Sequence, residues 1–578
     1  MNYEEIASKA KTDWDNMTNG RVPLIRIGTA MCGHAAGAFR VLETLKKYME
    51  ANGIEANIQE VGCLGLCYAE PLLDIKKPGK SRLFFNNVTP EDISQIIDEY
   101  LVSDKYPKEK IFGYIGEEGP LNDEASLESM PGLRLQNRIA LRNAGHTSPY
   151  DINQYIANGG YSGLNKALTN MSPTDVIDEV KNSGLRGRGG AAFPTGVKWS
   201  FLVGSPGPTK YILCNCEEGD PGAYNDKGIL ESDPHTLLEG LVIAGYATGA
   251  SNGVVFIRHG HDGPINRTEQ AIEQAYESGL LGENILGTDF SFDIEVALTG
   301  ESYVAGEETA LMEAVEGKRS MPRYRPPFPA AFGVWGKPSN INNVKSLSYA
   351  PEIISKGADW FSSIGVNQST GTAIVCLSGD VNRPGLYEVP MGLTLGEVIN
   401  DLGGGVSDNG QLKLLQTGGP LGGVLGPDSK DIHIDFDEMR SAGAIFGSGG
   451  IIVGSDRVCA VDLTRVLVAF CQFESCGKCF PCRLGMEHLL EIVERIANYE
   501  SKPGDMDLMK SVGGTMEAGS LCGHGQLGFG PIRSAITHFE EDFRLHIEEN
   551  RCPTGTCDRS KIVPKNTRPY ATDHVIGE

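Results

Sequence analysis

The chain has 578 residues, of which 40% are hydrophobic and 22% charged, so it is long enough for several domains with cores of their own. Its 51 basic and 75 acidic side chains give a formal net charge of −24, which argues against nucleic acid as a partner because phosphates require a basic surface. No run of eighteen apolar residues and no secretion signal occur, so we expect a cytoplasmic protein that does not insert directly into a membrane.

The first 110 residues have the pattern of a small α/β domain. Their apolar residues predict a strand, a helix, a second strand, a hairpin and a final helix, over residues 23–30, 36–53, 54–63, 71–88 and 89–102. The same region carries Cys32, Cys63 and Cys67. An iron–sulfur cluster held by thiolates needs four cysteines, so this set is one short.

The rest of the chain divides by composition and periodicity. A polar linker is expected first, then a core of alternating helices and strands with glycine loops, then short strands and turns, then helices, and finally a polar tail. The expected ranges are 111–150, 151–365, 366–455, 456–545 and 546–578.

A glycine-rich stretch, GLRGRGGAAFPTGVKW, opens the predicted core. Gly187, Gly189 and Gly190 can present successive backbone N–H groups to an anion, and Arg188 and Lys198 add positive charge. The stretch is neither a Walker A loop nor the usual dinucleotide fingerprint. A phosphate-binding loop and a tight structural turn both remain open from these residues alone.

An acidic loop follows, NCEEGDPGAYNDKGILESDPH, beginning at Asn215. Carboxylates beside a glycine turn suit a ligand that offers hydroxyl and ring N–H groups, although a solvated acidic loop has the same composition. The stretches YVAGEETALM, from Tyr303, and NINNV, from Asn340, similarly place small residues beside acids or amides.

The strongest local signal is a C-x2-C-x2-C triplet with one remote cysteine. These residues are Cys476, Cys479, Cys482 and Cys522. The chain has 14 cysteines, and we expect a reducing environment. Three close thiolates and a fourth distant one then suit a [4Fe-4S] cluster. Zinc is the rival metal, and unliganded core cysteines are the third possibility. We interpret Cys376 and Cys459 as core residues rather than ligands.

Taken in order, these motifs resemble those of the flavin-carrying subunit of respiratory complex I and of its relatives in NAD-reducing and electron-bifurcating hydrogenases and NAD-dependent formate dehydrogenases. The likeness spans about residues 150–545. The additional N-terminal domain looks more like the B subunit of bifurcating hydrogenases and transhydrogenases. The resemblance implies an α/β multidomain fold: a thioredoxin-like domain, a Rossmann-like core for FMN and NAD(H), a ubiquitin-like β-grasp domain and a helical bundle holding [4Fe-4S].

The resemblance also assigns residues to ligands. FMN would contact Gly187, Arg188, Gly189, Lys198, Asn215, Glu217, Glu218, Tyr303, Gly306, Glu307, Asn342 and Asn343. The nucleotide NAD(P)H would contact Phe193, Phe201, Asp220, Glu308 and Phe328. At Glu217 the family usually has Asp. No side chain is expected to act as a catalytic base, because the chemistry belongs to FMN.

By this resemblance the chain is an oxidoreductase subunit that exchanges hydride between NAD(P)H and FMN and passes single electrons to iron–sulfur clusters. We expect a bifurcating or confurcating hydrogenase or transhydrogenase complex, with a formate dehydrogenase, complex I, or a structural subunit with an inactive flavin site as alternatives. The expected partners are a multi-cluster A-type subunit and a small thioredoxin-like [2Fe-2S] subunit. No two-cluster ferredoxin module follows Cys522, so electrons would leave through another subunit.

Two further metal sites are implied less completely. Relatives with a similar tail hold zinc, and here His546, Cys552 and Cys557 would bind it with Cys471 as the fourth ligand. An exposed tail pair, or a ligand set completed by another subunit, is the alternative.

The second incomplete site is the N-terminal cysteine set. Thioredoxin-like [2Fe-2S] domains have C-x4-C followed by C-x3-C, and this chain has Ile27 where the first cysteine would stand. No cluster, a cluster with a non-cysteine ligand such as His34, and zinc or another metal are the three possibilities.

Overall fold

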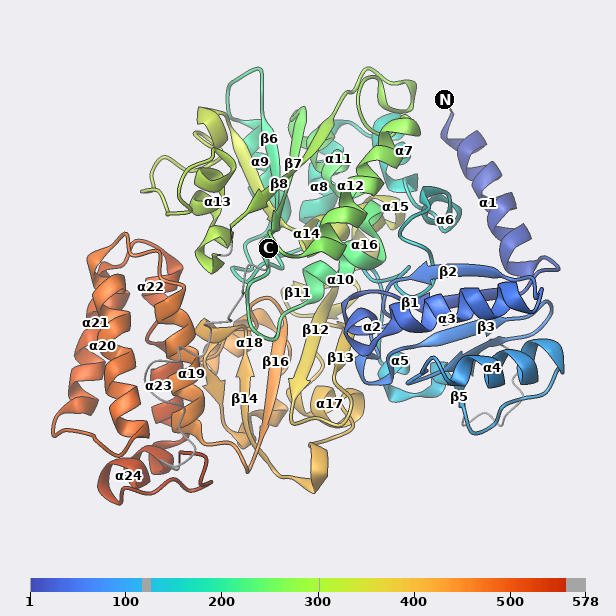
Figure 1. Cartoon of the computed structure of the whole chain (residues 1–578). Helices are drawn as coiled ribbons and strands as arrows, with labels where there is room; N and C mark the ends of the chain where they lie inside the picture. Colours follow the sequence, from blue (N-terminus) through green and yellow to red (C-terminus); the bar gives the residue numbers. More distant parts are fainter. Residues whose placement is uncertain (1, 117–125, 301, 558–578) are drawn as a thin grey trace, which may run out of the picture.

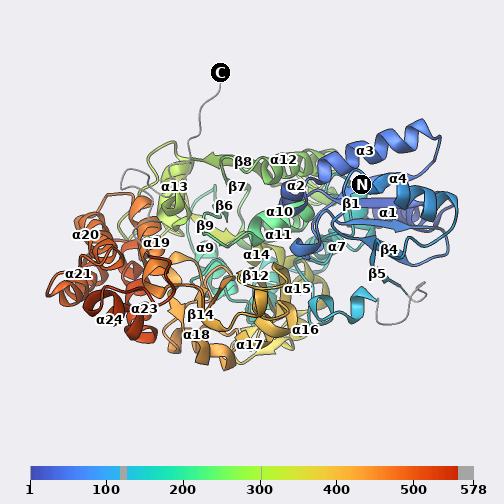
Figure 2. The same ribbon diagram turned by 60° about the horizontal axis from the view of Figure 1, so that its bottom comes forward.

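The computed structural model describes residues 2–116, 126–300 and 302–557. The end of the predicted tail, 558–578, and part of the predicted linker, 117–125, lie outside the described residues. Figure 1 shows the N-terminal domain and the C-terminal helices at opposite ends, with the core and a β domain between them, and the turned view in Figure 2 agrees. Within the described ranges, no helix combines the length and apolar character that crossing a membrane requires.

The N-terminal domain is a mixed sheet of order β2-β1-β3-β4-β5 flanked by helices. Strand β1 pairs in parallel with β2 and antiparallel with β3, so the expected strands and hairpin form. The expected helix over 36–53 forms as α3, and Gly37, at φ 97°, separates it from an additional short helix, α2, that the sequence did not predict. The elements are α1 (Tyr3–Asn19), β1 (Leu24–Gly28), α2 (Met31–Ala36), α3 (Ala38–Ala51), β2 (Asn57–Val61), β3 (Leu73–Lys76), β4 (Arg82–Phe85), α4 (Asp92–Ile96) and β5 (Ile111–Ile115).

The segment expected as a linker is structured where it is described. Its start forms β5, which pairs antiparallel with β4 and so belongs to the first sheet. Further on, after the short helix α5 (Pro131–Arg134), the backbone N–H groups of Ile139, Ala140 and Leu141 donate to the Glu388 carboxylate at 2.8–3.1 Å. Glu388 is fully buried, so one side chain fastens this segment to the β domain.

The core is a parallel sheet of order β8-β7-β6-β9 with helices on both faces. Its central helix α11 is almost wholly buried, as the apolar run around residue 240 requires. The elements are α6 (Ile152–Ala157), α7 (Ser162–Asn170), α8 (Pro173–Asn182), α9 (Thr195–Val203), β6 (Tyr211–Cys216), α10 (Asn225–Ser232), α11 (Pro234–Thr248), β7 (Asn252–Arg258), α12 (Asp262–Glu277), β8 (Asp293–Thr299), α13 (Glu308–Val315), β9 (Ser339–Asn343), α14 (Val344–Ser348), α15 (Ala350–Lys356), α16 (Ala358–Ser362), β10 (Gly365–Val366) and β11 (Ser369–Thr370).

The β domain is a sheet of order β13-β12-β16-β14-β15 in which β12 and β16 are parallel and the other pairs antiparallel. Helix α17 and the turn after it pack Leu395, Val398 and Leu402 on this sheet, which is the β-grasp arrangement expected. The elements are β12 (Thr372–Gly379), β13 (Gly385–Pro390), α17 (Leu395–Glu397), β14 (Leu412–Thr417), β15 (Val424–Leu425), α18 (Phe436–Ser441) and β16 (Gly450–Ser455).

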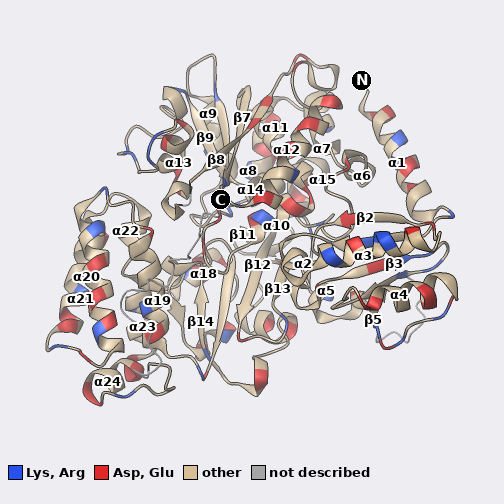
Figure 3. Cartoon of the chain, viewed as in Figure 1, with Lys and Arg blue, Asp and Glu red and all other residues tan. Residues whose placement is uncertain are grey.

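The C-terminal part is helical. Helices α19 and α20 pack side by side, α21 packs on α20, and the shorter helices close the bundle. They are α19 (Ala460–Phe473), α20 (Phe480–Ala497), α21 (Asp505–Gly519), α22 (Gly523–Leu527), α23 (Gly530–His538) and α24 (Glu540–Glu548). Figure 3 shows acidic and basic residues interspersed on α3, α20 and α21.

The contact of Glu388 with the 139–141 segment can be tested by hydrogen exchange. In Glu388→Ala, three buried N–H groups lose their acceptor, which lowers the local opening free energy by about 3 kcal/mol. Amide exchange of residues 139–141 should then accelerate on the order of 100-fold. The exposed Glu273→Ala is the matched control. Equal protection in both variants would show that Glu388 does not hold this segment.

Candidate functional site

The motifs picked from the sequence meet at the carboxyl ends of the parallel strands. Strand β6 ends at Cys216 and runs into the acidic loop, and β9 ends at Asn343 beside it. The glycine loop precedes α9 and reaches the same edge, because Gly189 lies against Asn343: a Cβ on Gly189 would sit 3.0 Å from the Asn343 Cβ. Ligands of open α/β sheets bind at this edge.

The glycine loop is held in a narrow turn. The N–H of Gly187 donates to the Phe193 carbonyl at 2.8 Å, and Gly190 has φ 113°, which L-residues with a Cβ rarely adopt. The Arg188 guanidinium is buried and donates to the carbonyls of Thr370 and Thr372, at 2.6 and 3.2 Å. Its positive charge therefore braces the β domain, which differs from the expectation that it adds charge to the loop.

The three predicted asparagines brace the strand ends. The Asn215 side chain donates to the Gly306 carbonyl at 2.7 Å and accepts the Glu217 N–H at 3.1 Å. Asn342 accepts from the Trp199 indole at 3.2 Å. Asn343 donates to Asp226 at 2.5 Å. Buried amides with these partners fix the loop geometry around the site.

The carboxylates of the acidic loop divide into two kinds. Glu218 accepts the N–H groups of Asp226 and Lys227, at 3.0 and 2.9 Å, and so caps α10. Glu217 and Asp220 are buried, and each has one carboxylate oxygen without a hydrogen-bond partner among the described residues. Buried polar atoms without partners are rare, so these two oxygens fit a ligand that carries hydroxyl or N–H donors.

Burial also changes the protonation of this loop. It raises the pKa of Glu217 to about 8, although the Arg258 guanidinium lies 2.8 Å away and opposes the shift. Burial likewise raises the pKa of Asp220, whose other oxygen accepts from Ser448 at 2.8 Å. Sequence reasoning missed Arg258, because it ends β7 with no motif around it.

Charged side chains close the outer side of the site. Lys198 forms an ion pair with Glu308, and both side chains are partly exposed. Arg325, which sequence reasoning also missed, lies 3.4 Å from Glu307 and 3.5 Å from Glu308. Glu307 accepts the N–H of Thr309 at 2.9 Å and caps α13. Because an exposed ion pair contributes little free energy, Lys198 and Glu308 can separate and bind a ligand instead.

The predicted aromatic residues are exposed although they are apolar. Phe193, Phe201 and Phe328 are 45%, 55% and 61% exposed, and the rings of Phe193 and Phe201 lie 6.1 Å apart. Tyr324 on the same loop as Phe328 is 73% exposed and was not predicted. Exposed aromatic faces beside a polar site are suited to stacking on a planar ring.

The four cysteines of the strongest sequence signal come from the starts of two helices and from the loop before the first of them, which holds Cys476. Cys479 precedes α20 as its N-cap, Cys482 lies in the first turn, and Cys522 is the N-cap of α22. Burial, with the neighbouring thiols of Cys479, Cys522 and Cys476, raises the pKa of Cys482 to about 12. Four thiols that repel one another's charge fit a shared cationic cluster.

Tyr303 connects this cysteine group to the acidic loop. Its ring packs edge-on against Phe470 and His524, at 5.4 and 5.8 Å, and its N–H donates to Glu474 at 2.8 Å. The Tyr303 hydroxyl lowers the pKa of Asp220 and so opposes part of the increase that burial causes. Lys478, between the cysteines, donates to the Pro322 carbonyl at 2.6 Å. The two parts of the candidate site are thus in direct contact.

A second sulfur and nitrogen group lies at the C-terminal end of the bundle. The ligand atoms of Cys459, His546, Cys552 and Cys557 all lie within 4.8 Å of one another. Cys459 Sγ is 3.6 Å from His546 Nε2 and 3.7 Å from Cys557 Sγ. Ligands of a tetrahedral zinc ion lie about 3.3–3.8 Å apart, given bonds of about 2.0–2.3 Å. The donor set fits zinc.

This group corrects two predictions from the sequence. Cys459, interpreted as a core residue, occupies the position assigned to Cys471 as fourth ligand. Cys471 is buried within α19, where its carbonyl accepts from His524 at 2.8 Å. Cys459 is the N-cap of α19 and lies far from the tail in sequence, so no spacing rule identifies it.

The three N-terminal cysteines also meet. The sulfur atoms of Cys32, Cys63 and Cys67 lie within 4.8 Å of one another. Ile27 is buried in the domain core. His34, considered as a fourth ligand, is exposed and packs edge-on against Phe39 at 5.0 Å, outside the group. The structure therefore removes His34 from the ligand set.

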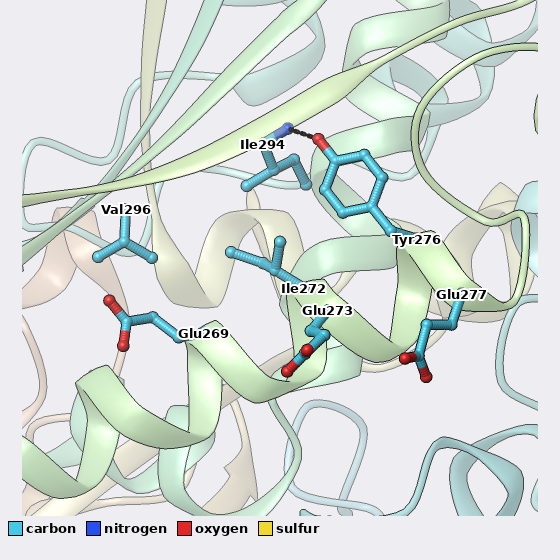
Figure 4. A pocket seen from close by; sticks show the side chains of 7 residues that line it. All are labelled: Glu269, Ile272, Glu273, Tyr276, Glu277, Ile294 and Val296. Atoms are coloured by element: carbon cyan, nitrogen blue, oxygen red, sulfur yellow. Dashed lines mark hydrogen bonds between the residues drawn. The ribbon is translucent and has the colours of Figure 1, made fainter.

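A separate pocket lies on the outer face of the core and takes no part in this arrangement. Figure 4 shows it between α12 and the edge strand β8, where the Tyr276 hydroxyl accepts the Ile294 N–H at 3.3 Å. Its lining consists of Glu269, Ile272, Glu273, Tyr276, Glu277, Ile294 and Val296. It faces away from the carboxyl ends of the strands, where the predicted residues gather.

The raised pKa of Glu217 predicts a pH dependence. Between pH about 4.5 and about 8 the folded protein keeps a proton that the unfolded chain releases, so this group stabilises fully below pH about 4.5 and its contribution is lost as the pH rises through about 8. From pH about 6 to 9, the thermal midpoint of FMN-free Glu217→Gln should fall less than that of the wild type. Glu273→Gln is the exposed control, and equal slopes in all three proteins would contradict the assignment.

Comparisons with known proteins show which families the chain resembles. Three family models match it: the Nuo51 FMN-binding domain over residues 180–352, the SLBB domain over 374–425 and the NADH-ubiquinone oxidoreductase-F iron–sulfur binding region over 462–546. The structure of an NAD+-reducing [NiFe]-hydrogenase in the air-oxidized state aligns with a TM-score of 0.63 and 26% identity, covering 94% of this chain and 88% of that one.

Curated relatives agree with the models. The NADP-reducing hydrogenase subunit HndC of Solidesulfovibrio fructosivorans is 46% identical over 422 residues, 73% of this chain and 86% of the relative. The F 2 subunit of the NADH-quinone oxidoreductase of Rhizobium meliloti is 41% identical over 415 residues, 72% and 99% of the two chains. The chain therefore belongs to the family of FMN- and [4Fe-4S]-containing flavin subunits of NADH-quinone oxidoreductases and hydrogenases, and is an oxidoreductase with NADH as the family's substrate.

Proposed function

We propose that this chain is the NAD(P)H–FMN oxidoreductase subunit of a multi-subunit electron-bifurcating or confurcating complex of hydrogenase or transhydrogenase type. The observation that carries the proposal is the position of Tyr303 between Asp220 of the acidic loop and His524, which lies beside Cys522 of the four-cysteine group. This position joins a two-electron site to a one-electron site. The N-terminal thioredoxin-like domain and the likeness to HndC support a hydrogenase-type complex.

In this proposal the loop backbone holds FMN. Gly187 and Gly189 present N–H groups to the phosphate, and Lys198, released from Glu308, adds the positive charge. The unpartnered oxygens of Glu217 and Asp220 accept hydrogen bonds from ligand hydroxyl and ring N–H groups. FMN, when bound, exchanges hydride with nicotinamide and single electrons with an iron–sulfur cluster. Asn215, Glu218, Tyr303, Gly306, Glu307, Asn342 and Asn343 complete the proposed FMN set.

The nicotinamide nucleotide is proposed to enter from the exposed aromatic side. Phe193, Phe201 and Phe328 stack on its planar rings, and Glu308 accepts hydrogen bonds from its hydroxyl groups. The Arg325 side chain stands beside Glu307 and Glu308 and is suited to a nucleotide phosphate. The protein binds and orients the two ring systems and keeps water from between them, and no proton is moved by a side chain.

The four thiols of Cys476, Cys479, Cys482 and Cys522 are proposed to hold the [4Fe-4S] cluster. Electrons leave this chain through partners, for which an A-type multi-cluster subunit and a small thioredoxin-like [2Fe-2S] subunit are proposed. All described cysteines are free thiols, which supports a reducing compartment such as the cytoplasm. A formate dehydrogenase or complex I subunit remains the alternative for the complex, and an inactive structural subunit the alternative for the site.

A cysteine variant separates the flavin site from the cluster. We expect purified wild-type protein to contain FMN and about four irons in the cubane, and Cys482→Ala to lose that iron while retaining FMN. The variant should still reduce an artificial acceptor that reacts with flavin directly. Cys376→Ala, a buried cysteine outside every candidate ligand set, is the control and should retain both cofactors. If the wild-type protein shows no flavin absorbance after anaerobic reconstitution, the alternative of a structural subunit with an inactive flavin site is supported.

The type of complex is decided by its native partners. The chain is purified with its partners, and NAD(P)+ reduction is assayed with and without ferredoxin. If the complex bifurcates or confurcates electrons, the rate of NAD(P)+ reduction should depend on the presence of ferredoxin. Turnover with NAD(P)(H) alone, or copurification with a formate dehydrogenase catalytic subunit, contradicts the proposed complex but not the flavin site.

We also propose that Cys459, His546, Cys552 and Cys557 bind zinc. His546 Nδ1 lies 2.6 Å from the Asp542 carbonyl, so it carries the proton and leaves Nε2 for the metal. The four ligands come from the start of α19, from α24 and from the segment after it, so the ion ties the chain's last described residues to the bundle.

The corrected ligand gives a matched pair of variants. Cys459→Ala should lower the zinc content by about one ion per chain, because three ligands bind more weakly than four, whereas Cys471→Ala should leave it unchanged. Elemental analysis of both proteins measures this. Loss of zinc in Cys471→Ala alone would restore the ligand set predicted from the sequence.

A further inference from the structure

The three N-terminal cysteines come from separate segments that meet at one point. Cys32 lies in α2, Cys63 follows β2, and Cys67 begins a short 3-10 turn. Their sulfur atoms lie within 4.8 Å of one another, and those of Cys32 and Cys67 are 2.8 Å apart. None is in a disulfide. The fold therefore assembles a compact group of three thiols.

This group does not fit a [2Fe-2S] cluster. Such a cluster takes four ligands, two on each iron. Ile27, at the fourth position, has no donor atom and is buried in the domain core. His34 is exposed and faces Phe39. With three sulfur atoms so close together, the thiols suit one ion rather than two.

The three sulfur atoms are close enough to share a single tetrahedral ion. With metal–sulfur bonds of about 2.3 Å, zinc thiolates lie about 3.8 Å apart, so the Cys32 and Cys67 sulfur atoms, 2.8 Å apart here, separate by about 1 Å when the ion binds. Thiolates also select soft metals over calcium or magnesium. The N–H of Gly65 donates to Cys63 Sγ at 3.2 Å, as backbone donors do around metal thiolates.

A buried carboxylate stands beside the thiols. Glu70 is 6% exposed and hydrogen-bonds to Cys63, and one of its oxygens accepts the Leu72 N–H at 2.7 Å. Two glycines make room for it: a Cβ on Gly28 would lie 2.9 Å from one oxygen, and a Cβ on Gly33 3.2 Å from the other. No described basic side chain forms an ion pair with Glu70, so its buried carboxyl group relies on the Leu72 N–H and the Cys63 thiol for hydrogen bonds.

We propose that Cys32, Cys63 and Cys67 bind one zinc ion whose fourth position is taken by a solvent oxygen, with Glu70 acting on the site through Cys63 and not as a ligand. A hydrogen-bonding group behind a ligand orients it and tunes the metal. Binding displaces the thiol protons to solvent, and no electron is transferred. The site does not depend on the proposed flavin function, and it excludes the N-terminal domain as an electron relay in this chain.

The position of the site indicates what the ion does. The N–H of Met31, next to Cys32, donates to Glu231 of α10 at 2.7 Å. The carbonyl of Gly65, between the other two cysteines, accepts the Leu386 N–H of β13 at 2.9 Å. An ion that joins these segments adds a link beside the surface by which the N-terminal domain docks on the core and the β domain.

The test counts metals in the full chain. All proteins carry Cys459→Ala to remove the C-terminal group, are purified anaerobically from zinc-supplemented medium, and are analysed for zinc and iron. We expect about one zinc and about four irons per chain in this background, loss of the zinc in Cys63→Ala, and no change in Cys376→Ala. Flavin content reports separately on the core, so failure here leaves the proposed function standing.

Further measurements keep the proposal falsifiable if Cys63→Ala does not fold. Zinc-edge X-ray absorption of the Cys459→Ala protein should give three sulfur ligands and one oxygen, and Glu70→Gln should release zinc to a chelator at least about 10-fold more readily. About six irons per chain with a second reducible cluster by EPR would overturn the proposal. So would a zinc-free protein with a Cys32–Cys67 disulfide detected by mass spectrometry.

Discussion

A single buried lysine holds the candidate site together. Lys345 Nζ is almost inaccessible to solvent and donates to Asn225 at 2.5 Å and Asp226 at 2.9 Å, and it lies 3.3 Å from the Ser448 carbonyl of the β domain. Asp226 also accepts from Asn343 at the end of β9, and its N–H is held by Glu218. Removing one partner of such a pair leaves a buried charge uncompensated, which costs about 3–5 kcal/mol. The acidic loop, the strand end and the β domain are therefore fixed as one unit.

This frame explains why other polar groups nearby can stay unsatisfied. Glu218 and Asn343 form the hydrogen bonds that brace the loop. Glu217 and Asp220 are therefore held in place although each keeps a carboxylate oxygen without a hydrogen-bond partner among the described residues. Buried carboxylate oxygens without partners are unfavourable in the empty protein, and a ligand with matching donors removes that cost. The folding energy of the surrounding network thus preorganises the site for its cofactor.

How far the sequence predicted the site depended on whether the signal was local. Closely spaced cysteines and glycine loops were identified because their chemistry is set by neighbours in the chain, and the strands and hairpin of the first domain followed from alternation. Arg258 and Cys459 were missed because each acts through a partner distant in sequence. Arg188 was placed in the right loop, but its side-chain direction depends on the β domain packed behind it. The 111–150 segment was interpreted as a linker from its overall polarity, although its first five residues, IFGYI, are largely apolar and form the edge strand β5.

The N-terminal domain docks through its apolar surface and not through its cysteines. Leu64 and Leu66, on either side of Gly65, belong to one apolar cluster with Val375 and Tyr387 of the β domain. Burial of this shared surface keeps the two domains docked whatever metal the adjacent thiols bind. A chain that has Ile27 in place of a cysteine can therefore lose a redox centre there and keep its architecture, because the docking depends on apolar packing and backbone hydrogen bonds. Tyr303 packs against His524, beside Cys522, and so keeps the core and the four-cysteine group in contact independently of the N-terminal thiols.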